Sequence, residues 1–446
     1  MMRIPGYCRK ILTLLNDAGY ECYVVGGAVR DLVTGKIPSD YDLTTSALPD
    51  ETVSVLNGSG IRTVPTGIRH GTVTAVIDGN PVEITTYRID GSYQDHRRPD
   101  HVDFSRNIEE DVRRRDFTMN ALYLDKDGRV VDLTGGLDDI RSGLIRAVGD
   151  PSLRFEEDAL RIMRGLRFAA ATGFDIEGRT YDAMISSAHL LSDIAAERIS
   201  AEFCGLMTAP YASRVIRTSV PILKVIIPEL EECQGFDQRS PYHDKDVLEH
   251  TLDVLDNLPR GGDGRRDLSL AMAALFHDIA KPRCLQTDGH MRDHPLIGSV
   301  IAERVLKDLR CRSSLISDTT RLVRYHDQYA SPDRISVHRF MCGCGKEFVK
   351  KLVVLQKADI LAHSERGRQR IDLLNRLISI GKELSGEGAA FSVSELKIDG
   401  NDIREAGVSP GPEVGLILSR LMDDHINDIV PNVREELLAR LKFIIC

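Results

Sequence analysis

The sequence predicts an α+β fold, in which a small head with a mixed or antiparallel sheet precedes a long body made of helices. Patterns of short strands and tight turns are confined to about residues 21–135. From about residue 150 onward, apolar residues recur with the helical period and almost no strand pattern is present. The chain has 446 residues, and domains usually hold roughly 100 to 200, so about two to four domains are expected.

The strands of the head are predicted from three parts of the sequence. CYVVGG (22–27) predicts a strand that runs into a turn. TVTAVID (72–78) and PVEITTYRI (81–89) predict two strands joined by a tight hairpin, because an Asp-Gly pair separates them. TMNALYLD (118–125) and VVDL (130–133) predict a second hairpin.

The body is predicted to be helical because its apolar residues follow the 3.6-residue period. RFEEDALRIMRGLRFAAATG (154–173) is one such helix, and it ends on a glycine. PRGGDGRRD (259–267) and SGEGAAFS (385–392) are rich in glycine and polar residues, and they predict loops between helical segments.

Composition limits the classes of function. The net charge of −9 argues against indiscriminate nucleic-acid binding, so phosphate contacts must come from local basic patches such as HRRP (96–99) and RRRD (113–116). No apolar run reaches the roughly 18 residues of a membrane span, so no membrane partner is expected. We expect no signal peptide and a cytoplasmic location. Nine cysteines without a framework spacing predict reduced thiols.

The stretch VVGGAVRDLVTGKIPSDYDL (24–43) combines a glycine pair, an arginine and two carboxylates. Asp40 and Asp42 are two residues apart, and in a strand such residues point to the same side. Two close carboxylates repel unless a cation lies between them, and hard divalent ions such as Mg²⁺ prefer oxygen ligands. Gly26 and Gly27 let a ligand approach the backbone, and Arg30 provides a fork for phosphate. The stretch therefore predicts a site for a nucleoside triphosphate with magnesium.

This stretch resembles the signature of the class II tRNA nucleotidyltransferase and poly(A) polymerase family, which belongs to the DNA polymerase beta-like nucleotidyltransferases. Further stretches resemble motifs of that family in the same order. YQDHRRPDHVDF (93–104) resembles its flexible loop, and RRRDFTMNALYLD (113–125) resembles its ribose-recognition motif. DPSLRFEEDALRIMRGLRFAA (150–170) resembles its base-recognition helix, and AAERISAEF (195–203) resembles the motif that supports that helix. Together they cover nearly half of the chain.

The resemblance implies a role for each residue of the ribose motif. Asp116 would recognise the ribose 2′-hydroxyl, and Arg114 and Arg115 would lie near the triphosphate or the sugar. Asn120 is four residues beyond Asp116, so the two share a side if the segment is helical.

Two interpretations are open for Asp158 and Arg161. Their i, i+3 spacing alone favours an intrahelical ion pair. The resemblance instead implies that they hydrogen-bond the edge of the incoming base and select C, C and A without a nucleic-acid template. Glu157 would orient Arg161 from i−4, and Arg164 would reach the base or the RNA backbone.

Other acidic and basic residues are expected to support the site. Arg198 and Glu202, at i, i+4, are expected to brace a neighbouring helix. Glu83 is expected to be a structural carboxylate bonded to an arginine. The family's flexible loop, which here contains Asp95, Arg97 and Arg98, is absent from enzymes that add only CC, so its presence implies full CCA addition.

A second series of residues in the body resembles the H…HD…D motif of the HD phosphohydrolase superfamily. The matching residues are His250, His277, Asp278 and Asp359. Imidazoles with carboxylates suit a transition-metal ion that activates water for phosphoester hydrolysis. His294 and His326 would complete a second metal position, and Lys281 would contact substrate phosphate. The alternative is that these residues are buried polar structure in an inherited fold.

The resemblance implies a CTP,ATP:tRNA nucleotidyltransferase whose partners are the tRNA 3′ end, CTP and ATP, and whose cofactor is Mg²⁺. The corresponding parts are a head at 1–140, a helical neck for base and RNA recognition at 141–225, an HD-type body at 226–365 and a tRNA-binding helical tail at 366–446.

Three alternatives stay open at this point. The first is an enzyme that adds only A, or a poly(A) polymerase, because these share the head. The second is an HD-domain phosphohydrolase whose head binds RNA, and the third is a non-catalytic RNA-binding protein. The sequence makes no prediction of the oligomeric state.

Overall fold

The computed structural model describes residues 2–90 and 102–445. The chain forms two compact units, which are described separately below. The first unit comprises Met1–Pro228 with Asp308–Arg310, and the second comprises Glu229–Lys307 with Cys311–Cys446. The predicted division into four parts stays a prediction.

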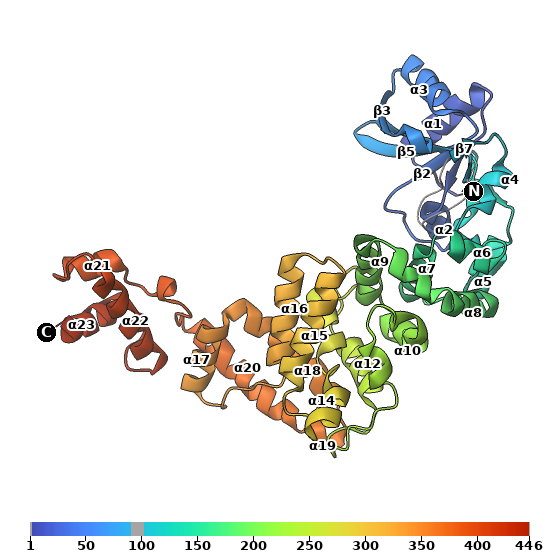
Figure 1. The fold of residues 1–446 in the computed structure, drawn as a ribbon. Coiled ribbons are helices and arrows are strands. Elements are labelled where there is room, and N and C mark those ends of the chain that lie inside the picture. The colour runs from blue at the N-terminus through green and yellow to red at the C-terminus, as the bar shows by residue number, and fades with distance from the viewer. Residues whose placement is uncertain (1, 91–101, 446) are drawn as a thin grey trace. The chain divides into compact units, whose positions relative to one another are not determined.

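The first unit contains a seven-stranded mixed sheet (Figure 1). Its strands, in spatial order, are β3 (Arg62–Gly67), β4 (Thr72–Ile77), β5 (Asn80–Thr86), β2 (Asp42–Thr45), β1 (Cys22–Val25), β8 (Leu122–Leu124) and β9 (Val130–Asp132). Strands β2 and β5 run parallel, and the other neighbouring pairs are antiparallel. Two short pairs lie outside this sheet: β6 (Arg88–Asp90) with β7 (Val102–Phe104), and β10 (Leu144–Ile145) with β11 (Asp175–Ile176). The predicted α+β class with a mixed sheet is confirmed.

Both predicted hairpins are present. Strands β4 and β5 meet at Asp78 and Gly79, whose φ angles of 50° and 78° are both positive, as a type I′ turn requires. The second predicted strand of this hairpin is shorter than expected and ends at Thr86. Strands β8 and β9 form the other hairpin, but Thr118–Asn120 is a 3₁₀ turn and not part of a strand.

Helices complete the first unit. They are α1 (Gly6–Asp17), α2 (Gly27–Val33), α3 (Pro49–Gly58), α4 (Ile108–Arg113), α5 (Gly136–Ser142), α6 (Pro151–Glu157), α7 (Leu160–Thr172), α8 (Gly178–Ser186), α9 (Ala196–Thr208) and α10 (Ala212–Leu223). Helix α1 buries one apolar face that includes Ile11, Leu12 and Leu15. Helices α7 and α9 pack against each other, and this contact supports one wall of the site described below.

The prediction of a single helix over 154–173 is wrong at one point, because the segment forms two helices, α6 and α7. Asp158 separates them, with an extended backbone (φ −142°, ψ 98°). Its carboxylate accepts the backbone N–H of Leu160 at 3.1 Å, so it satisfies one of the free N–H groups at the start of α7. The predicted end is confirmed, since Gly173 adopts a left-handed φ of 76° directly after α7.

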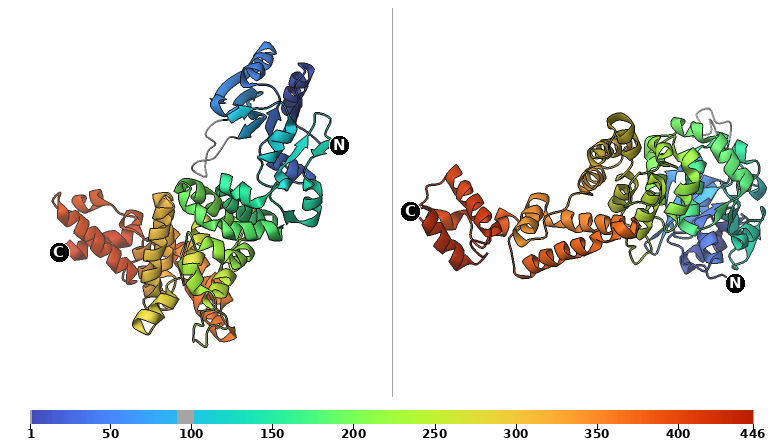
Figure 2. Two further views of the ribbon diagram at one scale, coloured as in Figure 1. Left: turned by 45° about the vertical axis from the view of Figure 1, so that its right-hand side comes forward. Right: turned by 90° about the horizontal axis from the view of Figure 1, so that it is seen from below.

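In its described residues the second unit contains only helical elements and loops (Figure 2). Its α-helices are α11 (Glu229–Cys233), α12 (Val247–Asn257), α13 (Leu268–Phe276), α14 (Lys281–Asp288), α15 (His294–Asp308), α16 (Ser313–Tyr325), α17 (Arg334–Cys344), α18 (Lys346–Ala362), α19 (Glu365–Arg368), α20 (Arg370–Gly386), α21 (Gly400–Glu405), α22 (Pro412–Ile426) and α23 (Arg434–Ile445). Helix α18 packs against α12, α13 and α20. The two predicted loops are present, although α20 continues to Gly386.

Composition predicted reduced thiols and no membrane span. Every cysteine in the described part of the chain is a free thiol. No helix there has both the length and the apolar character that crossing a bilayer demands.

Candidate active site

A cavity of about 690 Å³ in the first unit brings the predicted nucleotide residues together. Those that line it are Gly26, Gly27, Arg30, Asp40, Asp42, Arg114, Arg115, Asp116, Asn120, Asp158, Arg161 and Arg164. Asp95, Arg97 and Arg98 of the predicted flexible loop lie outside the described residues.

The glycine pair turns strand β1 into helix α2 at the edge of this cavity. Gly26 has φ 75° and ψ −140°, a conformation that side chains rarely permit, whereas Gly27 begins α2. One turn later, Arg30 donates from Nη1 to Asn120 Oδ1 at 2.9 Å, and from Nε and Nη2 to Asp31 at 3.0 and 2.8 Å. The guanidinium group of Arg30 is thus held at the cavity wall by hydrogen bonds to Asn120 and Asp31.

Three carboxylates face the cavity from two neighbouring strands and from the segment before one of them. Asp42 is the first residue of β2, and Glu83 lies on the adjacent strand β5. Asp40 precedes the strand, so the expectation that both aspartates alternate within it is wrong, yet both line the same cavity. Partial removal from solvent, together with the charges of Asp40 and Glu83, raises the pKa of Asp42.

Glu83 was expected to be bonded to an arginine. Among the arginines that the structure describes, none forms an ion pair with it. Glu83 is exposed on the cavity wall instead, and it contributes to the raised pKa of Asp42. The predicted structural role therefore has no support from the described arginines, and Glu83 belongs with the two aspartates.

The ribose motif is anchored by a residue that the sequence analysis did not single out. Asp111 is fully buried within α4, and it accepts Arg114 Nη2 at 2.6 Å and Arg115 Nη2 at 2.8 Å. The hydroxyl of Tyr123 donates to the same carboxylate at 3.0 Å. Burial alone would raise the pKa of Asp111, but the charges of the two arginines outweigh it and lower the pKa to about 2.

Asp116 lies next to this network and faces helix α7. It accepts Arg164 Nε at 3.0 Å and Nη2 at 2.8 Å, and Asn120 Nδ2 at 3.4 Å. Burial opposes ionisation of Asp116, but the charge and hydrogen bonds of Arg164 outweigh burial and hold its pKa below the usual value. Asp116 and Asn120 do share a side, through the 3₁₀ turn rather than an α-helix.

The intrahelical pair of Asp158 with Arg161, which their spacing alone favoured, is absent, and two other pairs take its place. Asp158 accepts Arg198 Nη2 of α9 at 2.9 Å. Arg161 donates to Glu157 at 2.7 Å, as expected for a residue at i−4, and also to the backbone carbonyl of Arg114 at 2.8 Å. The reason is the break between α6 and α7, which removes the i, i+3 geometry.

Helix α9 braces α7 as the spacing of Arg198 and Glu202 predicts. Glu202 accepts a hydrogen bond from Arg167, and Arg198 holds Asp158. Beside them the ring of Phe168 lies among three guanidinium groups, with its centroid 5.3 Å from Arg30 Cζ, 5.4 Å from Arg164 Cζ and 4.3 Å from Arg167 Cζ. Such contacts fix the direction of long cationic side chains.

The predicted H…HD…D residues come together in the second unit, where a cavity of about 170 Å³ adjoins them. Asp359 Oδ1 lies 3.0 Å from His250 Nε2 and 3.7 Å from His277 Nε2. Asp278 Oδ2 lies 3.3 Å from His277 Nε2, and its Oδ1 lies 3.1 Å from His294 Nε2. Asp278 therefore stands between the two groups of ligands that the sequence suggested.

Backbone contacts orient three of these histidines. The Nδ1 atoms of His277, His294 and His326 lie 2.8, 2.6 and 2.7 Å from the carbonyl oxygens three residues earlier. Because a carbonyl only accepts, each Nδ1 bears the proton and each Nε2 presents its lone pair to the centre. Lys281 Nζ lies 2.6 Å from Asp278 and also donates to Gln238.

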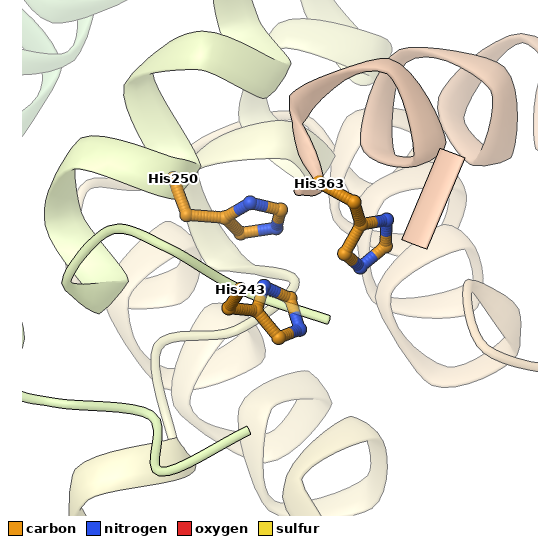
Figure 3. A group of neighbouring side chains, drawn as sticks. All are labelled: His243, His250 and His363. Carbon is orange, nitrogen blue, oxygen red and sulfur yellow. The ribbon is translucent and has the colours of Figure 1, made fainter. Parts of the chain in front are cut away.

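Two further histidines beside this centre were not singled out from the sequence. His243 and His363 lie next to His250 (Figure 3). A signal was present for His363, because it follows Asp359 by four residues and so shares its helix face. Burial, followed by the charge of Lys281, lowers the pKa of His243 to about 2.

Comparison with known proteins gives similarity along the whole chain. Residues 22–146 match the family described as the poly A polymerase head domain, residues 173–233 a probable RNA- and SrmB-binding site of polymerase A, and residues 247–379 the HD domain. A CCA-adding enzyme of Streptococcus pyogenes (serotype M5, strain Manfredo) is 33% identical over 452 residues, which cover 98% of this chain and 99% of that protein.

Solved structures agree with this similarity. The Bacillus stearothermophilus CCA-adding enzyme in complex with CTP matches with a TM-score of 0.67 and 26% identity, over 98% of this chain and 96% of that one. The Thermotoga maritima CCA-adding enzyme complexed with tRNA matches in fold, with a TM-score of 0.61 and 18% identity, over 100% of this chain and 97% of that one.

Proposed function

Because the chain belongs to the family of CCA-adding enzymes with an HD domain, we propose that it adds the terminal CCA sequence to the 3′ end of tRNA from CTP and ATP. The observation that supports this most is that one cavity of the first unit gathers the groups such a reaction needs. Carboxylates, phosphate-binding arginines, and the residues assigned to ribose and base all line it. Such a cavity accommodates a whole nucleoside triphosphate beside a reacting hydroxyl.

The carboxylates fit a divalent cation. Asp40, Asp42 and Glu83 place three acidic groups on one wall, and partial removal from solvent, followed by the charges of Asp40 and Glu83, raises the pKa of Asp42. A cation would relieve the repulsion among these charges, and oxygen ligands suit Mg²⁺. We assign Asp40 and Asp42 as its ligands. Bound there, Mg²⁺ would supply positive charge to the α-phosphate and to the attacking tRNA 3′-hydroxyl.

The other residues would bind and orient the nucleotide. The backbone at Gly26 and Gly27 would approach the triphosphate, and the forks of Arg30, Arg114 and Arg115 would neutralise it. Asp116 would accept the ribose 2′-hydroxyl. Held in this way, the α-phosphate faces the tRNA 3′-hydroxyl in line with the pyrophosphate that leaves.

Base selection is assigned to Asp158 and Arg161. A carboxylate acceptor beside a guanidinium donor matches the amino group and ring nitrogen of cytosine, and a modest rotation of both suits adenine. In this structure both groups are held by protein partners, so nucleotide binding would exchange some of these contacts. The helical part of the chain, including the region 173–233, would hold the tRNA acceptor arm by shape and phosphate contacts.

The test offers tRNA that lacks its 3′ end together with CTP alone, ATP alone, or both nucleotides. The proposal predicts two additions with CTP alone, three with both, and none with ATP alone. Addition of A to the truncated tRNA, or chains of many A residues, would instead identify an A-adding enzyme or a poly(A) polymerase. Addition of only two C residues when both nucleotides are present would contradict full CCA addition.

A second activity, metal-dependent phosphoester hydrolysis, is favoured by the position of Asp278. Its two oxygens face separate histidine groups, so His250, His277, Asp278 and Asp359 fit one transition-metal ion and His294 and His326 fit another. RNA ends with a 2′,3′-cyclic phosphate are the proposed substrates. Metal analysis of the purified chain, and hydrolysis of a cyclic-phosphate oligonucleotide before and after chelation, test this activity. A chain that neither retains metal nor cleaves the ring would contradict it.

A further inference from the structure

His243, His250 and His363 form a three-histidine cluster beside the HD centre (Figure 3). One ring nitrogen of each lies within 4.8 Å of the others. The ring centroids are 4.4 to 5.2 Å apart. His250 and His363 are buried and His243 is half-buried, and His243 and His363 line the cavity of about 170 Å³.

The polypeptide holds these rings together by contacts between distant segments. Ser364 donates its backbone N–H to Tyr242 O at 2.9 Å and its hydroxyl to Pro241 O at 3.0 Å. Gly367 permits this approach, because a Cβ there would lie 2.5 Å from His363 Cβ and 3.0 Å from Tyr242 O. The segment before α12 and the end of α18 are therefore fixed against each other, one residue away from His243 and from His363.

The cluster is poorly explained as a structural core. Nδ1 of each of the three rings is buried and has no hydrogen-bond partner among the described residues. A buried nitrogen without a hydrogen-bond partner destabilises the fold, so a purely structural cluster would be expected to pair these atoms. The other three histidines of the HD centre differ, because backbone carbonyls satisfy Nδ1 of His277, His294 and His326.

We propose that His243, His250 and His363 form a binding site for a transition-metal ion of the zinc class, distinct from the two HD positions but sharing His250 with one of them. Three imidazoles without a thiolate suit Zn²⁺, Co²⁺ or Ni²⁺, and leave a fourth position for water or substrate. Asp359 Oδ1, 3.9 Å from His363 Nε2, supplies negative charge beside the ion. The nearby cation Lys281 is paired with Asp278.

Sharing His250 links this site to the proposed HD centre. The Nε2 atom of His250 also faces Asp359 at 3.0 Å and Asp278 at 3.5 Å. An ion at the three-histidine site would therefore share the imidazole of His250 with an ion in the HD centre, and the positive charge of each ion would weaken binding of the other. The inference rests on the proposed HD function only through this coupling.

The test uses the full chain, stripped by a chelator and titrated with Co²⁺ under optical absorption. Asp278→Asn removes the carboxylate common to both HD positions and leaves the three histidines intact. We expect this variant to bind one Co²⁺ per chain with the absorption of a low-coordinate nitrogen complex. Adding His243→Ala and His363→Ala is expected to abolish that binding, whereas adding the exposed His290→Ala leaves it unchanged.

The outcomes separate the two proposals. If the unmodified chain binds Co²⁺ but Asp278→Asn binds none, the three-histidine site is refuted and the HD centre stands. Binding to Asp278→Asn that survives loss of His243 and His363 also refutes it, and a chain that binds no Co²⁺ at all refutes both. Should circular dichroism show that Asp278→Asn is unfolded, the His243→Ala, His363→Ala chain with Asp278 intact must lose one step of the titration.

Discussion

Asp158 forms its ion pair with Arg198 of helix α9 at 2.9 Å, across 40 residues of sequence. The carboxylate assigned to base recognition is therefore positioned by a helix that does not itself bear a base-reading residue. Asp158 has no helical neighbours to fix it, since it lies in the break between α6 and α7.

The substitution Arg198→Met tests this positioning role. It keeps most of the side-chain volume and removes the charge, so Asp158 is expected to lose its orientation. We expect kcat/KM for CTP and for ATP to fall by about 100-fold, since misplacement of a contact by about 1 Å costs on that order. Arg179→Met, in an exposed position of α8, is the control. Unchanged incorporation of both nucleotides in Arg198→Met would show that Arg198 only braces the fold.

Asp111→Asn tests the buried anchor of the ribose motif. The amide loses the charge that holds Arg114 and Arg115, and breaking a buried pair costs about 3 kcal/mol. We expect a lower free energy of unfolding in urea and a raised KM for both nucleotides. Asp127→Asn, in the exposed turn after β8, is the control and should change neither.

The lowered pKa of Asp111 predicts how acid changes the free energy of unfolding. Its pKa falls from the ordinary 3.8 to about 2 on folding, so its stabilising contribution is complete above about pH 4 and is lost as the pH falls toward 2. At about 1.4 kcal/mol per unit the contribution is about 2 kcal/mol. Between pH 4 and 2, Asp111→Asn should therefore lose less stability than the unmodified chain. Parallel acid unfolding curves would contradict the low pKa.

Gly26 and Gly27, the two adjacent glycines at the edge of the nucleotide cavity, allow a matched pair of substitutions. Gly26→Ala must place a side chain at φ 75°, ψ −140°, which costs about 1–3 kcal/mol or moves the turn between β1 and α2. In Gly27→Ala the new Cβ meets nothing closer than Arg30 Nη2 at 3.5 Å, an ordinary contact. We expect only Gly26→Ala to lower the thermal unfolding midpoint by several degrees. Equal destabilisation by both substitutions would argue against a special backbone at Gly26.

Asp42→Asn is expected to separate activity from stability. Without the Asp42 carboxylate the cation is expected to be lost, and with it several kcal/mol of charge stabilisation in the transition state. CCA addition should therefore fall by on the order of 1,000-fold. The pKa of Asp42 is raised in the folded chain, so its ionised form opposes folding at neutral pH. The metal-free variant should thus unfold at a temperature equal to or above that of the parent. Asp17→Asn, an exposed carboxylate on α1, is the control.

The raised pKa of Asp42 also gives a pH dependence for cation binding. As the pH falls, Asp42 is protonated at a higher pH than an ordinary aspartate, so the affinity for Mg²⁺ should begin to fall earlier than for a solvated carboxylate. Calorimetric titration of Mg²⁺ over a pH series measures this. A steeper loss in the unmodified chain than in Glu83→Gln is expected, because Glu83 contributes to the shift.

Features that depend on neighbouring residues could be predicted from the sequence. The hairpin at Asp78 and Gly79 follows from the dihedral angles that this pair permits, and the end of α7 follows from Gly173. The histidines and aspartates of the HD centre were identified because their order along the chain is itself the pattern.

Features that depend on partners far away in the sequence could not be predicted from it. The helical period runs unbroken through Asp158, and only the capping and the pairing with Arg198 of α9 account for the break. The exposed position of Glu83 follows from the register of β5 beside β2, which no local signal fixes. His243 joins His363 because Ser364 bonds to Tyr242 and Pro241, more than 100 residues earlier in the chain.

The aromatic ring of Phe168, enclosed by the guanidinium groups of Arg30, Arg164 and Arg167, offers a practical use. The chain contains no tryptophan, so Phe168→Trp would introduce a single indole fluorophore into the nucleotide cavity. Its emission would respond when a bound triphosphate draws the surrounding cations away from the ring. Each nucleotide that enters during one round of CCA synthesis could then be followed optically in real time, without a radioactive label.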